Sequence, residues 1–112
     1  MDSKFIELVV EIVRFVDDTQ PGAVACEFVD AAGCRHTIID KVPMFTVESL
    51  DAESQYPQPG VVRCVVLNRW LDATGRQVVR ISTADPDVIE SSEDLSEFVV
   101  LATQLAAPGH AA

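Results

Sequence analysis

The first apolar stretch, residues 4–16, fits two periodicities. With a period of two, its apolar residues share one face and Glu7 and Glu11 lie on the other; with a period of 3.6, the two glutamates join a polar stripe on a helix. Six of the thirteen residues are Val or Ile, which suit a pleated strand better than a helix. The following Asp17-Asp18 pair has the wrong charge for a helix C-terminus. We therefore predict a strand.

Two later apolar stretches are each divided by a short turn sequence. Segments 23–30 and 34–42 flank Asp-Ala-Ala-Gly, and segments 61–71 and 76–83 flank Asp-Ala-Thr-Gly. Asp at the first position and Gly at the fourth favour a type I turn that closes with a Gly bulge. We therefore predict two β-hairpins. In the first, this register places Cys26 opposite Ile38 and Phe28 opposite His36.

Each predicted hairpin begins with the same short motif. Gln20-Pro21-Gly22-x-Val24-x-Cys26 matches Gln58-Pro59-Gly60-x-Val62-x-Cys64 at five of seven positions. We interpret residues 20–42 and 58–83 as duplicated hairpin units, each opened by a Pro-Gly turn at 19–22 or its equivalent. The alternative is that both copies use common turn sequences independently. Cys26 and Cys64 each share a strand face with a valine, which predicts buried thiols.

The C-terminal stretch, residues 95–105, is ambiguous. Leu95, Phe98, Ala102 and Leu105 fit one face of a helix, whereas the run Phe-Val-Val-Leu at 98–101 favours a strand. We predict a strand over 97–103. The alternative is an α+β fold with a C-terminal helix over 93–106. Residues 107–112 are predicted to form a flexible tail.

These elements predict an all-β fold: a six-stranded antiparallel small barrel or sandwich, built from two hairpins plus N- and C-terminal strands in one domain, residues 1–106. Isolated hairpins are marginal in water, so the two must pack together. The second hairpin is apolar on both faces and must be covered twice. The rest of the domain would provide one cover, and a loop, a helix or another subunit, as in a possible homodimer, would provide the other.

The connection at 43–60 is long and contains three prolines. Thr46 is placed to cap a short helical turn over 47–55. Long loops in compact domains usually pack over something or carry function. One hypothesis is therefore a small-ligand-binding β-barrel, possibly an enzyme, with this segment as a lid. Its candidate pocket residues are Met44, Phe45, Tyr56 and Trp70.

Composition narrows the function classes. The 112 residues carry a formal net charge of −10, which disfavours nucleic acid and anionic lipid as partners. No apolar run approaches the roughly 20 residues that a membrane-spanning helix needs. The N-terminal segment has no pattern of a signal peptide, and three cysteines are an odd number. We expect a cytoplasmic protein with reduced thiols.

Catalytic and metal-binding patterns are weak. Cys26, Cys34, His36 and Cys64 are the only zinc-ligand candidates within the domain, and no Cys-x-x-Cys pair occurs. His36 and Asp40 are four residues apart on a strand, roughly 13 Å, too far for direct contact. A strand histidine near a hairpin turn is most often a surface or rim residue, and we expect His36 to be one. We predict no catalytic residue, metal or cofactor.

The charges are unevenly distributed. Half of the basic residues lie in the second hairpin, whereas acidic residues gather in two loop segments. Internal ion pairing is one explanation. The other is a non-enzymatic protein-interaction module of a bacterial type that binds a basic protein partner, as an immunity protein or antitoxin does. The candidate interaction surface comprises Glu48, Asp51, Glu53, Asp85, Asp87, Glu90, Glu93 and Asp94.

Overall fold

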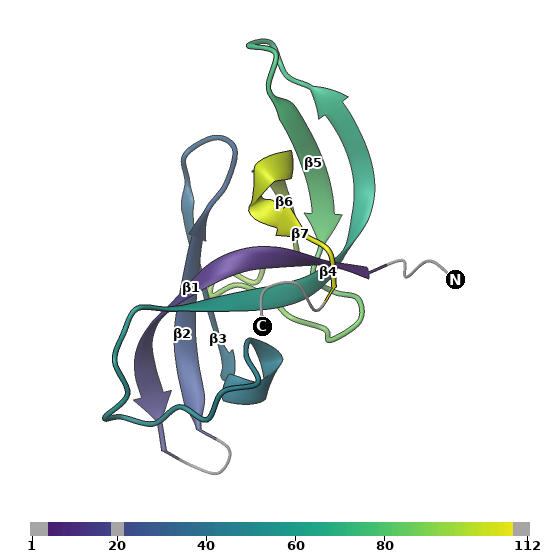
Figure 1. Ribbon diagram of the computed structural model, residues 1–112. Helices are drawn as coiled ribbons and strands as arrows, with labels where there is room; N and C mark the ends of the chain where they lie inside the picture. Colours follow the sequence, from purple (N-terminus) through teal and green to yellow (C-terminus); the bar gives the residue numbers. More distant parts are fainter. Residues whose placement is uncertain (1–4, 19–21, 109–112) are drawn as a thin grey trace.

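A long N-terminal strand organises the fold. The computed structural model describes residues 5–18 and 22–108, and its first strand, β1 (Phe5–Asp17), confirms the predicted strand (Figure 1). Leu8, Val10 and Ile12 are buried on one face of β1 while Val9 and Glu11 are exposed on the other. This is the period-two pattern of a half-buried strand.

The other strands extend the sheet on both sides of β1. The sheet order is β3-β2-β1-β4-β5-β6, with every pairing antiparallel. The strands are β2 (Ala23–Val29), β3 (Arg35–Lys41), β4 (Gln58–Leu71), β5 (Gln77–Ser82) and β6 (Glu97–Leu101). Figure 1 shows that the sheet curls into a half-barrel, which confirms the predicted all-β antiparallel fold.

Both predicted hairpin turns are present. The first hairpin pairs Cys26 with Ile38 and Phe28 with His36, as the sequence predicted. Gly33 and Gly75 occupy the fourth turn positions with φ of 86° and 85°, which glycine adopts readily. The first strands of the two hairpins, β2 and β4, both pair with β1. The predicted turn at 19–22 falls largely outside the described residues, and the duplication itself stays a prediction.

The C-terminal segment is extended, as predicted, and the alternative of a helix over 93–106 is wrong. β6 ends at Leu101, two residues earlier than expected. A short 3-10 turn, η2 (Ala102–Gln104), leads into β7 (Leu105–Ala106), which pairs with Glu7 and Leu8 of β1. The predicted tail lies mostly outside the described residues.

A loop closes the gap between the two ends of the sheet. We call residues 83–96, between β5 and β6, the acidic loop. Its Ser92 N–H donates to the Thr37 carbonyl of β3 at 2.8 Å, and Ala31 in the first hairpin turn donates to Val99 of β6 at 2.9 Å. These hydrogen bonds hold the β3 end of the sheet near the β6 end.

The core lies inside the curled sheet. Its largest fully buried side chains include Leu8, Ile12, Ile38 and Phe45. Cys26 and Cys64 are also fully buried, as predicted from their strand positions. All three cysteines are free thiols.

The connection between the hairpins differs from the prediction. Its helical turn, η1 (Val42–Met44), comes directly after β3, with Pro43 at a position that favours helix initiation. Thr46 does not cap a helix over 47–55; its hydroxyl accepts a hydrogen bond from the Glu48 N–H at 3.1 Å in a local turn. In the described part of the chain, no helix has the length and apolar character needed to cross a membrane.

Candidate functional site

A cavity lies beneath the connection between the hairpins. It has a volume of about 700 Å³ and is bounded by the end of β1, Gly22 before β2, η1 and residues 46–51. Its apolar lining includes half-buried Phe15 and Leu50 and buried Val42. Three exposed carboxylates line it as well, from Asp18, Glu48 and Asp51. The site therefore combines an apolar base with negative charge.

Local hydrogen bonds fix the wall of this cavity. The Asp51 carboxylate accepts a hydrogen bond from the Glu53 N–H at 2.9 Å, and the Tyr56 hydroxyl donates to the Asp51 carbonyl at 2.7 Å. At the other end, the Phe45 carbonyl accepts the Val61 N–H of β4 at 2.9 Å. The wall is thus anchored to β4 and shaped by its own side chains.

The predicted acidic surface divides into two groups. Glu48 and Asp51 line the cavity, and Glu53 is exposed beside them in the same segment. The other five residues belong to the acidic loop, which follows this segment in sequence after β4 and β5. The exposed members of that second group are Asp85, Glu90, Glu93 and Asp94.

Two members of the acidic loop are engaged internally. Asp87 receives hydrogen bonds from Arg63 Nε at 3.1 Å and Nη2 at 2.8 Å, and only 14% of its side chain is exposed. Glu93 places a carboxylate oxygen 3.6 Å from His36 Nδ1. Arg80 and Glu97 form a longer pair of 4.0 Å. Internal ion pairing therefore accounts for part of the charge pattern, and Arg63 already occupies both carboxylate oxygens of Asp87.

The four predicted pocket residues lie at two ends of the molecule. Tyr56 precedes β4 and Trp70 is its penultimate residue, so the 14-residue strand separates them by on the order of 40 Å. Phe45 is 1% exposed and belongs to the core, with Met44 packed against it. Trp70 instead lines a pocket of about 220 Å³ between the two hairpin turns and another of about 300 Å³ on the second hairpin.

The buried His36 pairs with Asp30 in the first hairpin turn and lies close to Glu93 of the acidic loop. His36 is 8% exposed, against the expectation of a surface or rim residue. Its Nε2 lies 2.7 Å from the Asp30 carboxylate, which can only accept the hydrogen bond. The ring packs against both Phe28 and Phe98, with centroid distances of 5.2 and 4.9 Å.

The hydrogen bonds at Asp30 also set its acidity. Burial alone would raise the pKa of this carboxyl, but hydrogen bonds from His36, from the Cys34 N–H and from the Ala32 N–H lower it overall. The ionised form of Asp30 is therefore the one that holds the turn. Sequence spacing missed this pair because His36 reaches back across its own hairpin turn rather than along its strand.

The cysteines offer little nucleophilic chemistry. Burial, assisted by the charge of Asp40, raises the pKa of the Cys26 thiol to about 12. Burial, with a further contribution from Glu7, raises the pKa of the Cys64 thiol to about 12 as well. Thiols in this state are not nucleophiles near neutral pH. Cys34, beside the first turn, is exposed.

The described residues contain no cluster of three or more His, Cys, Asp or Glu side chains suited to a metal ion. The acid-lined cavity is therefore the candidate site that combines volume, apolar surface and charge.

No protein-family model, curated protein or solved structure matches this chain.

Proposed function

We propose that this chain is a non-enzymatic protein-interaction module that binds a basic protein partner through its acidic surface. The observation that carries the proposal is the cavity of about 700 Å³, in which Asp18, Glu48 and Asp51 surround an apolar base. An immunity protein or antitoxin directed against a basic toxin is the functional class that fits best. We further propose a cytoplasmic location, in keeping with three free thiols.

Physical arguments support a basic occupant. A lysine or arginine side chain has an apolar stem and a charged head, so it can cover Phe15 and Leu50 while its charge meets a carboxylate. The net charge of −10 also attracts cationic partners from a distance and repels nucleic acid. Complementary charge raises association rates and selects against wrong partners.

A second candidate is the small-ligand-binding β-barrel. The observation that favours it is the position of residues 46–51, which form one wall of the cavity as a lid segment would. In this case, the occupant is a small organic cation rather than a protein segment. Because Tyr56 and Trp70 lie far apart, the ligand site would be this cavity alone.

Binding of a basic peptide tests the proposal. The probe is a fluorescent capped peptide, Lys-Lys-Val-Val-Val-Lys-Lys, titrated in low salt. The double variant Asp18→Asn/Glu48→Gln removes two cavity carboxylates and leaves Asp51 to shape its own turn. We expect about tenfold weaker binding, and weaker wild-type binding as salt increases.

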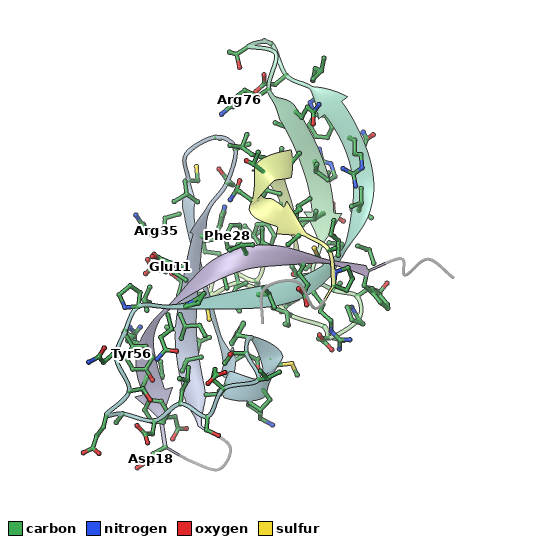
Figure 2. All side chains as sticks on the ribbon, in the orientation of Figure 1. Glu11, Asp18, Phe28, Arg35, Tyr56 and Arg76 are labelled. Carbon is green, nitrogen blue, oxygen red and sulfur yellow. The ribbon has the colours of Figure 1, made fainter. Side chains whose placement is uncertain are left out.

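The matched control removes the same charge elsewhere. Glu11→Gln/Glu97→Gln changes two exposed carboxylates on β1 and β6, outside the cavity lining (Figure 2 labels Glu11 and Asp18). We expect this variant to bind within about twofold of wild type, since screening confines surface electrostatics to roughly 10 Å. Equal losses of peptide affinity in both double variants would show that only the net charge matters, and would contradict a cavity site.

A further inference from the structure

The outer edge of β3 carries unused backbone hydrogen-bonding groups. β3 ends the sheet order and pairs only with β2 among the described strands. The turn hydrogen bond from Asp30 N–H to Cys34 O fixes the alternation of the antiparallel ladder. Even-numbered residues of β3 therefore direct their backbone groups toward β2, and odd-numbered residues direct theirs outward.

Two of the outward-facing residues already form a hydrogen bond with one of their two backbone groups. The Thr37 carbonyl accepts the Ser92 N–H of the acidic loop, and the Lys41 N–H donates to the Asp40 carboxylate at 2.8 Å. Within residues 5–18 and 22–108, the Thr37 N–H and both backbone groups of Ile39 form no hydrogen bond. The Ile39 side chain is also 46% exposed. An open stretch of strand edge therefore centres on Ile39.

This open edge runs between the two acidic groups. At one end Ser92 binds Thr37, and Glu93 and Asp94 follow in the acidic loop. At the other end β3 passes directly into η1 (Figure 1), whose Val42 and Pro43 line the acid-lined cavity. The arrangement provides backbone groups in the centre and carboxylates on both flanks.

We propose that the basic partner docks as an extended strand along the outer edge of β3, an inference that rests on the proposed function. Its backbone pairs with Ile39, an apolar residue covers the Ile39 side chain, and basic residues at its two ends reach Glu93 and Glu48. Strand addition of this kind takes affinity from main-chain hydrogen bonds and specificity from side chains. β3 itself carries two cations, Arg35 and Lys41, which would repel a basic partner. The charge of Arg35 is already paired with Glu27 at 2.8 Å.

Backbone methylation of the peptide tests this geometry. Alternate amides of an added strand face the sheet, so N-methylation at residues 3 and 5 of Lys-Lys-Val-Val-Val-Lys-Lys blocks one set and methylation at residue 4 blocks the other. Charge is identical in all three peptides. We expect one methylated peptide to bind about tenfold more weakly and the other to bind like the unmodified peptide.

The outcomes separate this inference from the proposed function. If both methylated peptides bind like the unmodified one, edge pairing is wrong and a cavity site for basic partners stands. If the unmodified peptide also fails to bind in low salt, the proposed function itself is wrong.

Two protein variants provide an independent check. Ile39→Pro removes an outward N–H at an edge-strand position, where proline is tolerated, and Ile39→Thr changes the same side chain while keeping that N–H. We expect about tenfold weaker binding for the proline variant and at most about threefold for the threonine variant. Equal affinities for the two variants would overturn the pairing. The methylated peptides keep the test valid if proline perturbs β3.

Discussion

The two hairpin turns have the same backbone geometry in different surroundings. In the first, Asp30 Oδ1 accepts hydrogen bonds from Ala32 and Cys34 N–H at 2.9 and 3.0 Å. In the second, Asp72 Oδ1 accepts them from Thr74 and Arg76 N–H, both at 2.9 Å. The matching sequence pattern therefore produces a matching turn.

The second oxygen of each aspartate distinguishes the two turns. Asp30 Oδ2 contacts buried His36, inside a hairpin held by the acidic loop, whereas Asp72 Oδ2 accepts a hydrogen bond from the half-exposed Arg76 at 2.8 Å. The second hairpin projects from the body in Figure 1, and Arg76 Nη2 donates to the Ala31 carbonyl of the first turn at 3.0 Å. The same sequence pattern forms both turns, and we expect long-range packing to decide how much stability each carboxylate contributes.

The largest expected difference between the turns follows removal of the aspartate. Asp30→Ala should lower the free energy of unfolding by about 3 kcal/mol, because it removes the turn hydrogen bonds and leaves His36 buried without its partner. Asp72→Ala should cost clearly less, since the half-exposed Arg76 keeps its hydrogen bond to Ala31 and its access to water. Urea denaturation at pH 7 measures both. Equal losses would show that His36 adds nothing to the first turn.

Substitution of the turn glycines should affect both hairpins alike. Gly33 and Gly75 have nearly equal positive φ and open space where a Cβ would lie. Gly33→Ala and Gly75→Ala should each cost about 1–2 kcal/mol, the price of the left-handed region for an L-residue. The same denaturation experiment checks this, and a clearly larger loss at one site would mean that its surroundings constrain the turn.

Acid should weaken both turns. The pKa of Asp30 is lowered, and hydrogen bonds from Thr74 and Arg76 lower the pKa of Asp72 strongly. A carboxyl whose pKa is depressed in the folded state stabilises the fold at pH values above its unfolded-state pKa, near 4. It loses that contribution as the pH falls toward its folded-state pKa. Urea midpoints from pH 7 to 2.5 should therefore fall less steeply for Asp30→Asn and Asp72→Asn than for wild type. Parallel curves would contradict these pKa shifts.

The smallest expected difference concerns the two buried thiols. Cys26 and Cys64 should both stay unreactive toward an aromatic disulfide reagent at pH 8, because each has a pKa of about 12. Cys34 should react at once, so the native protein yields one thiol and the denatured protein yields three. Cys34→Ser should abolish the rapid reaction. Rapid labelling of either buried thiol would show that its hairpin opens.

Much of the fold could be predicted from local sequence. The Val and Ile content of residues 4–16 decided between helix and strand for β1, and the Asp-x-x-Gly turns fixed the register that pairs Phe28 with His36. Long-range contacts could not be predicted in the same way. His36 packs against Phe98 and lies near Glu93 of the acidic loop, both more than fifty residues away in sequence.

The candidate site was predicted less well, for physical reasons. Glu48 and Asp51 line the cavity, but the pairing of Asp87 with Arg63 spans 24 residues and leaves no local signal. Trp70 and Tyr56 were predicted to line one pocket at the barrel mouth, although the length of β4 separates them. The open edge of β3 follows from the strand order, which hairpin patterns alone do not determine.

Amide chemical shifts during titration with Lys-Lys-Val-Val-Val-Lys-Lys test the central claim most directly. The account predicts the largest shifts at Thr37 and Ile39 on β3 and at Glu48 and Leu50 in the cavity wall, with slower amide exchange at Ile39 once the peptide is bound. Shifts confined to the second hairpin around Trp70, or spread evenly over the acidic surface, would contradict both the cavity site and the strand edge.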